Sequence, residues 1–172
     1  MSIEINLLPE YKKSILENKV TLVKNFSKIS TEYDFNSLVN FIENYDPKIL
    51  QKTNGDVFQS CFSIPRLQGH FHDFSYFQNF LREVFNYTKQ DMDGCDIFFS
   101  LKSGAGECHS DEEDVFLIGL NGTTNYKTIG KEINNYQISK GDLLFIPRGI
   151  LHKVIPLSSR IVLSIAFWGC KR

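Results

Sequence analysis

The spacing of hydrophobic residues changes about halfway along the chain. In the first ninety residues, hydrophobic positions recur every three to four residues in two stretches, which predicts two helices with one buried face each. The two stretches consist of Phe35, Leu38, Val39, Ile42 and Tyr45, and of Phe74, Phe77, Leu81, Val84 and Phe85. Asp73 is the expected N-cap of the second helix. Residues 21–26 (TLVKNF) predict an edge strand, and Pro9 predicts the start of a short helix.

From Cys95 onward, short runs of β-branched and aromatic residues alternate with turns that contain Gly or Asn. The runs are CDIFFSLK, DVFLIGL, NYKTI, INNYQIS, DLLFIP, HKVIP and RIVLSIAFW. Six or seven strands at this spacing are typical of a sandwich or a barrel. The pattern therefore predicts an α+β chain that is mainly β, with its helices packed on a sheet. No repeat or low-complexity linker divides the chain, so we expect one domain over residues 1–172.

Composition and charge narrow the class of protein. The 172 residues are 42% hydrophobic, which is enough for one substantial core, and the formal net charge is −1. The chain therefore has no overall excess of positive charge that would bind nucleic acid or an anionic membrane. The longest apolar run, residues 161–168, is far shorter than the roughly 20 residues of a membrane span, and the start MSIEINLLPE lacks the order of a signal peptide. A cytoplasmic protein is expected, and its four widely spaced cysteines favour reduced thiols.

The segment His109-Ser110-Asp111 carries the clearest chemical signal. It follows the glycine-containing turn SGAGEC and precedes the strand DVFLIGL. Residues i and i+2 of an extended chain project to the same side, so this imidazole and this carboxylate can reach one cation. The acidic residues that follow, Glu112 to Asp114, are expected to be solvated, or one of them hydrogen-bonds a ligand histidine.

A third metal ligand must come from elsewhere in the chain, and His152 is the best candidate. It follows a predicted strand and a tight Pro-x-Gly turn, and it opens the next strand. Two histidines and one carboxylate form the facial arrangement that suits non-haem Fe(II) and leaves positions open for substrate and dioxygen. A second pair of histidines, His70 and His72, is expected to belong to the entry of a helix, because no downstream motif selects it.

Two segments resemble the motifs of one family. Residues 141–152 (GDLLFIPRGILH) match the second cupin motif, G-x5-P-x-G-x2-H, although Pro156 replaces the asparagine often found four residues later. Residues 109–122 (HSDEEDVFLIGLNG) resemble the metal-binding strand of the JmjC-like Fe(II)/2-oxoglutarate oxygenases, which include protein hydroxylases and ribosomal oxygenases. VTLVKNF looks like the opening strand of that family, so the resemblance covers most of the chain.

The resemblance implies a fold, a metal site and an activity. The fold is a double-stranded β-helix (jelly-roll, cupin-like) with helices packed on one sheet, forming a single JmjC/cupin-like oxygenase domain over residues 1–172. The iron ligands implied are His109, Asp111 and His152. The activity implied is hydroxylation of a C–H bond with 2-oxoglutarate and dioxygen as cosubstrates. The expected substrate is a protein side chain first and a small metabolite second.

The 2-oxoglutarate site departs from the family pattern. Such proteins often place a lysine two residues after the glycine that ends the metal-binding strand, and Thr124 stands there, following Gly122. Lys127 is near but has the wrong strand parity to face inward. Arg160, eight residues after His152, is the candidate anchor, with a surface arginine in the preceding turn as the alternative reading. Ser164 shares the face of Arg160 and, with Thr124, is expected to donate a lesser hydrogen bond to the cosubstrate.

Two other classes of function stay open. One is a metal-binding cupin of another class, such as an isomerase, an epimerase or a 2-oxoglutarate-independent dioxygenase, although those cupins commonly add a third His or a Glu. The other is a non-catalytic cupin that serves as a binding module. Succinate release coupled to oxygen uptake distinguishes the oxygenase from both. No pattern in the chain indicates an oligomeric state.

Overall fold

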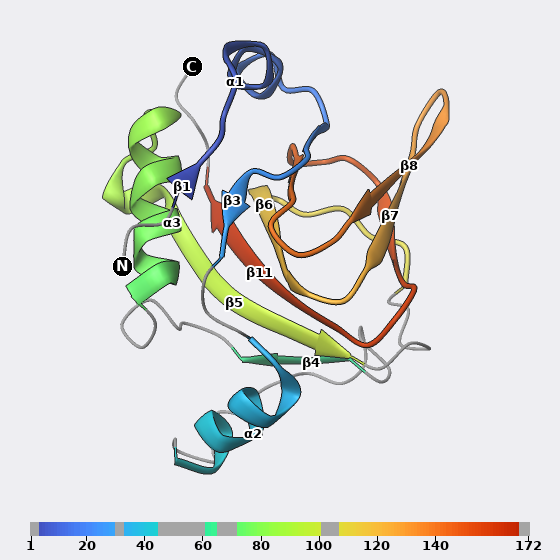
Figure 1. Cartoon of the computed structure of the whole chain (residues 1–172). Coiled ribbons are helices and arrows are strands. Elements are labelled where there is room, and N and C mark those ends of the chain that lie inside the picture. The colour runs from blue at the N-terminus through green and yellow to red at the C-terminus, as the bar shows by residue number, and fades with distance from the viewer. Residues whose placement is uncertain (1–3, 30–32, 45–60, 65–71, 101–106, 169–172) are drawn as a thin grey trace.

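The computed structural model describes residues 4–29, 33–44, 61–64, 72–100 and 107–168 of the chain (Figure 1). The secondary-structure elements in chain order are β1 (Glu4–Ile5), α1 (Pro9–Leu16), β2 (Thr21–Val23), β3 (Ser27–Lys28), α2 (Phe35–Asn44), β4 (Cys61–Ile64), α3 (His72–Val84), the 3-10 helix η2 (Lys89–Asp91), β5 (Met92–Ser100), β6 (Asp114–Asn121), β7 (Thr124–Ile129), β8 (Ile133–Ile138), β9 (Leu143–Ile146), β10 (His152–Pro156) and β11 (Arg160–Phe167). Within the described residues, no helix is both long enough and apolar enough to span a membrane.

Two antiparallel sheets form the body of the molecule. The larger sheet has six strands in the order β2-β9-β6-β11-β5-β4, and the smaller one has three in the order β10-β7-β8. The two sheets stand apart and enclose an interior, while β7 and β8 form a hairpin that extends past the barrel (Figure 1). Each strand predicted after Cys95 is present, and β2 is an edge strand as predicted. The predicted jelly-roll, mainly β fold is confirmed.

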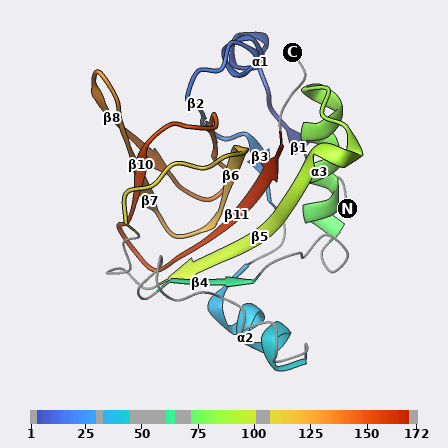
Figure 2. The same ribbon diagram turned by 180° about the vertical axis from the view of Figure 1, so that it is seen from behind.

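Helices α2 and α3 cover one side of this barrel. Viewed from either direction, α2 and α3 lie on the side of the six-stranded sheet that faces away from β7 and β8 (Figures 1 and 2). Helix α2 covers the first stretch predicted from the hydrophobic spacing except Tyr45, which lies outside the described residues. Helix α3 covers the second stretch up to Val84 and begins at His72, one residue before its expected N-cap at Asp73. Phe74, Phe77 and Leu81 of α3 are completely buried in the core of this side. The prediction of helices on one sheet is confirmed.

Strand β11 shows why the sheet has two different faces. Its residues pair with β5 on one side and with β6 on the other, so both edges of the strand are hydrogen-bonded. Ile161, Leu163 and Ile165 belong to the core under the helices, whereas Val162 belongs to a separate core cluster between the two sheets. Successive side chains of β11 point to opposite faces of the sheet, so one set packs under the helices. The other set, which includes Arg160 and Ser164, faces the interior between the two sheets.

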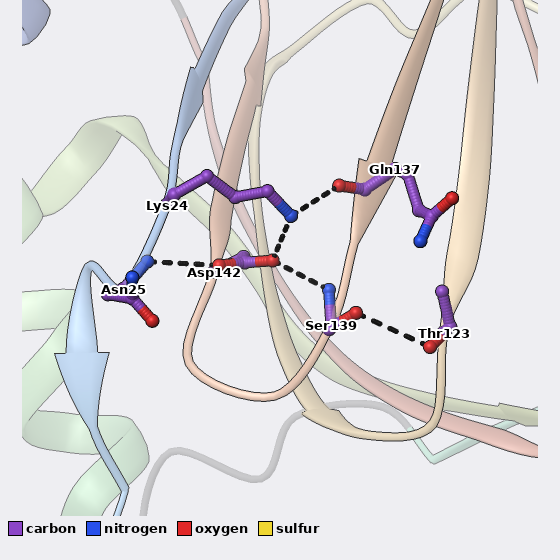
Figure 3. Close-up of polar contacts among 6 residues, drawn as sticks. All are labelled: Lys24, Asn25, Thr123, Gln137, Ser139 and Asp142. Atoms are coloured by element: carbon purple, nitrogen blue, oxygen red, sulfur yellow. Dashed lines mark hydrogen bonds and ion pairs between the residues drawn. The ribbon is translucent and has the colours of Figure 1, made fainter.

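A buried carboxylate joins the N-terminal segment to the barrel (Figure 3). Asp142, directly before β9, is 4% exposed. It accepts hydrogen bonds from Lys24 Nζ at 2.6 Å and from the backbone N–H groups of Asn25 at 3.0 Å and Ser139 at 2.9 Å. Lys24 also donates to the carbonyl of Gln137 at 2.9 Å. The Gly-Asp pair that opens the second cupin motif thus ties the segment after β2 to the turn between β8 and β9.

The turn between β6 and β7 requires glycine at position 122. Gly122 has a φ of +70°, and a Cβ added there would lie 1.9 Å from the carbonyl oxygen of Ser159. Gly149 has a similar φ of +74°, but a Cβ there would meet nothing within 4 Å. Both alanine variants bear the cost of the left-handed backbone, about 1 to 2 kcal/mol. Gly122→Ala adds a steric overlap that costs about 1 to 3 kcal/mol more.

We therefore expect Gly122→Ala to lower the free energy of unfolding by more than Gly149→Ala does. Urea unfolding of the two variants beside the wild-type protein measures the difference. Equal losses in the two variants would show that the backbone around Gly122 relaxes without cost.

Candidate metal centre

The three predicted metal ligands come together at one end of the barrel. His109 and Asp111 lie just before β6, and His152 is the first residue of β10. One ligand atom from each of the three residues lies within 4.8 Å of the others. Asp111 stands between the two histidines, with Oδ1 3.8 Å from His109 Nε2 and Oδ2 3.7 Å from His152 Nε2. No other group of three such residues gathers within the described residues.

The backbone brings the two histidines side by side. His109 forms an isolated antiparallel bridge with His152, in which the N–H of each residue donates to the carbonyl of the other at 3.0 and 2.7 Å. The N–H of Gly149 donates to the carbonyl of Asp111 at 2.8 Å and continues this pairing. The segment that carries the H-x-D motif is thus fastened to the turn that precedes His152, although the two lie far apart in sequence.

Each imidazole is oriented by its other nitrogen. His109 Nδ1 lies 3.0 Å from the carbonyl oxygen of Glu107, and His152 Nδ1 lies 3.0 Å from that of Ile150. A carbonyl oxygen only accepts, so Nδ1 carries the proton in both rings. The lone pair of each Nε2 then points to the space beside Asp111, and a backbone partner of this kind also fixes the ring of a metal-binding histidine.

His152 is buried, and this burial lowers its pKa below the ordinary value. The hydrogen bond to Ile150 and the charge of Asp111 oppose the shift, and His109 adds to it. The ring therefore stays neutral to more acidic pH than an exposed imidazole does. Only the neutral form can bind a metal ion.

The donor set fits one small divalent cation. Two imidazole nitrogens and a carboxylate oxygen are close enough to contact the same ion, and this combination is typical of non-haem Fe(II) sites. A closed tetrahedral zinc site would need a fourth protein ligand. His70, the other histidine singled out from the sequence, lies outside the described residues, as does the side chain of His72.

The triad opens into the barrel interior. A cavity of about 200 Å³ is lined by all three ligands and by apolar residues of both sheets, among them Phe98, Val115 and Val154. Its polar lining includes Asp96, Glu113, Tyr126, Arg160 and Ser164. A partly apolar cavity with a few convergent polar groups is the usual form of a small-molecule site.

Arg160 points into this interior, so the reading as a surface arginine is wrong. It is 2% exposed, and it lines the cavity that holds the triad. Its Nε donates to Ser100 Oγ at 3.0 Å, and its Nη1 donates to the hydroxyl of Tyr126 at 3.3 Å. Ser100 is the cross-strand partner of Arg160 on β5. Ser164, four residues further along β11, also lines the cavity.

Thr124 is buried on the inner face of β7, but it is not among the residues that line the cavity. Its hydroxyl has no hydrogen-bond partner among the described residues. Its predicted contact with a cosubstrate therefore stays a prediction. Lys127 has the opposite parity on β7 and is not buried, as expected.

Several site residues were not found from the sequence. Tyr126 alternates with Lys127 along β7 and is buried, but the sequence did not identify its hydrogen bond with Arg160, and Ser100 carried no signal at all. Asp114 was expected to be solvated and is instead buried, with Arg148 and Tyr87 as partners. A run of three acidic residues resembles a solvated surface, and only the paired strands reveal that its last member faces the core.

Comparison with known proteins agrees with this fold. No protein-family model matches the chain. Among curated proteins, it is 30% identical over 93 residues to the "Bifunctional lysine-specific demethylase and histidyl-hydroxylase NO66" of Branchiostoma floridae. That match covers 54% of this chain and only 15% of the relative.

Solved structures match over nearly the whole chain. The ribosomal oxygenase YcfD of Escherichia coli, in complex with cobalt and succinic acid, matches with a TM-score of 0.72 and 16% identity. The YcfD complex with cobalt and 2-oxoglutarate matches with a TM-score of 0.69 and 15% identity. Both matches cover 99% of this chain and 54% of YcfD. A prolyl-4-hydroxylase of Pseudomonas putida matches with a TM-score of 0.65 and 12% identity, over 95% of this chain and 100% of that one.

The chain therefore has the jelly-roll fold of the 2-oxoglutarate oxygenases, and the two histidines and the aspartate lie in its barrel. The solved structures of this fold that it resembles include the ribosomal oxygenase YcfD, so the resemblance predicted from the motifs is confirmed at the level of the fold. The chain spans about half the length of YcfD and a much smaller part of the curated relative.

Proposed function

We propose that the protein is an Fe(II)- and 2-oxoglutarate-dependent oxygenase that hydroxylates a C–H bond. The observation that carries this proposal is one cavity that holds both the His109–Asp111–His152 triad and the buried Arg160. A metal-binding module needs the triad alone. An oxygenase of this kind also needs a cation for the far carboxylate of 2-oxoglutarate, and a buried guanidinium supplies one.

The three ligands would hold iron through His109 Nε2, His152 Nε2 and the carboxylate of Asp111. When bound, Fe(II) supplies the activation of dioxygen that C–H hydroxylation requires. The protein's own contribution is to orient both rings through Nδ1, to keep His152 neutral by burial, and to surround the reacting groups with apolar side chains that exclude water.

For 2-oxoglutarate, Arg160 is the proposed anchor and Ser164 a hydrogen-bond donor, with Thr124 as a further donor. Ser100 and the hydroxyl of Tyr126 hold the guanidinium in place, so its orientation is set before a cosubstrate arrives. A pre-oriented guanidinium binds a carboxylate without losing further side-chain freedom.

The proposed substrate is a protein side chain, with a small metabolite as the second candidate and dioxygen as the other cosubstrate. The name of the curated relative includes a histidyl-hydroxylase, and YcfD is described as a ribosomal oxygenase. In this chain, Asp96 and Glu113 add two carboxylates to the cavity lining. Carboxylates accept hydrogen bonds and attract positive charge, which favours a substrate group that is a donor or a cation.

We further propose that residues 1–172 form a single oxygenase domain that acts in the cytoplasm and does not bind nucleic acid.

A cupin of another class and a non-catalytic cupin module are the competing functions. Neither of them requires a cationic anchor for a keto acid.

The test is succinate formation from 2-oxoglutarate by purified protein with Fe(II), with oxygen uptake followed in parallel. The expected result is succinate release that requires both iron and dioxygen and that increases with peptides bearing Arg, Lys or His side chains. If the protein loaded with Mn(II) fails to bind 2-oxoglutarate at millimolar concentration, the competing functions are favoured instead.

A further inference from the structure

Asp114 is a buried carboxylate that is not one of the three proposed metal ligands, and its two oxygens accept several hydrogen bonds. It is the first residue of β6, three positions after Asp111, and it is 1% exposed. Its Oδ1 accepts the backbone N–H of Arg148 at 3.1 Å and Arg148 Nε at 3.4 Å. Its Oδ2 accepts Arg148 Nη2 at 3.1 Å and the hydroxyl of Tyr87 at 2.9 Å.

The partners of Asp114 lie in the turn that leads to His152 and in the hydrophobic core. Arg148 belongs to the turn between β9 and β10, which leads directly to His152. Tyr87 is buried and stacks on Phe167 of β11 with ring centroids 4.3 Å apart, so its hydroxyl is a fixed point of the core. The carboxylate thus connects the end of the H-x-D segment, the turn before the second histidine, and the core.

The ligand segments need such a connection because regular structure stops short of them. His109 and Asp111 precede the first residue of β6, and among the described residues the backbone contacts that pair them with the opposite segment are the isolated bridge and the Gly149 hydrogen bond. Three backbone hydrogen bonds at the edge of a sheet fray easily. A buried carboxylate that holds a backbone N–H and a guanidinium together resists this fraying, because breaking it leaves a buried charge without a partner.

We propose that Asp114 is a positioning residue of the metal centre, which acts through Arg148 to hold the two ligand-bearing segments at the spacing that one cation needs. The proposal rests on the proposed function, since it assumes that the triad binds a metal. Its consequence is that Asp114 contributes to metal affinity beyond its contribution to stability.

Asp142 provides a matched control within the same chain. It is also a buried carboxylate at the end of a strand, it pairs with a lysine, and it accepts backbone N–H groups (Figure 3). It precedes β9, whereas Arg148 follows β9, so the two carboxylates serve opposite ends of that strand. Asp142→Asn therefore removes the same kind of interaction without touching the ligand segments.

The experiment titrates wild type, Asp114→Asn and Asp142→Asn with Co(II) and follows the visible absorption of the bound ion. Urea unfolding of the metal-free proteins measures stability. We expect both variants to lose stability, but only Asp114→Asn to bind Co(II) at least about tenfold more weakly, as found for groups that orient metal ligands. Asp142→Asn should stay within about twofold of wild type, a change small on that scale.

A second pair of variants covers the case in which Asp114→Asn fails to fold. Arg148 has a side chain that is 43% exposed, so Arg148→Ala removes the guanidinium and keeps the backbone contact. Arg148→Ala should weaken Co(II) binding, and Arg148→Lys should recover part of the loss, because the amine can still reach the carboxylate.

The outcomes distinguish the positioning role of Asp114 from the proposed function of the protein. If wild type binds Co(II) and neither Asp114→Asn nor Arg148→Ala binds it more weakly than Asp142→Asn does, the positioning role is wrong and the proposed function stands. Equal weakening in all these variants also overturns it, because general loss of stability then accounts for the effect. If wild type binds no Co(II), both the positioning role and the proposed metal site fall.

Discussion

Asp111→Ala is expected to weaken Fe(II) binding by more than about a hundredfold and to abolish 2-oxoglutarate turnover. Loss of a group that only supports a ligand already costs about 10- to 100-fold in affinity, so loss of the ligand itself costs more. Asp111 is also the only anionic member of the triad and lies between the two imidazoles. Without it, two neutral nitrogens alone would have to hold a dication.

Anaerobic calorimetry with Fe(II), or Mn(II) titration followed by electron paramagnetic resonance, measures this loss. Glu112→Ala is the matched control, because Glu112 is an exposed acid next in the chain and outside the cavity lining. Its metal affinity should equal that of wild type. Retention of wild-type affinity in Asp111→Ala would mean that the triad is not the metal site.

Arg160→Ala is expected to raise the apparent KM for 2-oxoglutarate by at least about tenfold and to leave metal affinity nearly unchanged. Each charge-assisted hydrogen bond to a carboxylate contributes roughly 1.5 to 3 kcal/mol in a partly dry cavity. Losing even one of them corresponds to about a tenfold change. The guanidinium contacts Ser100 and Tyr126 rather than the metal ligands, so the triad should keep its geometry.

The two effects are measured separately, by steady-state succinate formation at varied 2-oxoglutarate and by Co(II) titration. Arg160→Lys should give an intermediate KM, because an amine keeps the charge but loses the paired geometry of the guanidinium. Lys127→Ala is the control, since Lys127 lies on the opposite face of β7. An unchanged KM in Arg160→Ala would return the anchor role to Lys127 or to another base such as Lys102, which lies outside the described residues.

The strands and helices could be read from the sequence because their signals are local. Alternation in RIVLSIAFW places Arg160 and Ser164 on one face and the large apolar residues on the other, and the structure has this arrangement. The same holds for the helices, whose spacing of Phe74, Phe77 and Leu81 leaves one buried face. A side chain's face depends only on its place in its own strand or helix.

The metal ligands were also within reach of sequence analysis, because the chemistry needs particular residue types in two short motifs. The H-x-D pair shares one side of an extended segment, and the turn before His152 carries its own glycine and proline. That these motifs meet in space was an inference from resemblance, and the antiparallel bridge between His109 and His152 now provides the physical contact.

The sequence by itself determined which residues face inward, through hydrophobic alternation, and which can bind a metal, through its two motifs. Only the tertiary structure decided what those residues touch. Ser100 meets Arg160 because β5 and β11 pair in one register. Asp114 meets Arg148 and Tyr87 because the turn after β9 and the segment after α3 pack against the start of β6. The physical reason is that a face is set by each strand's own alternation, whereas a partner is set by the packing of the whole barrel.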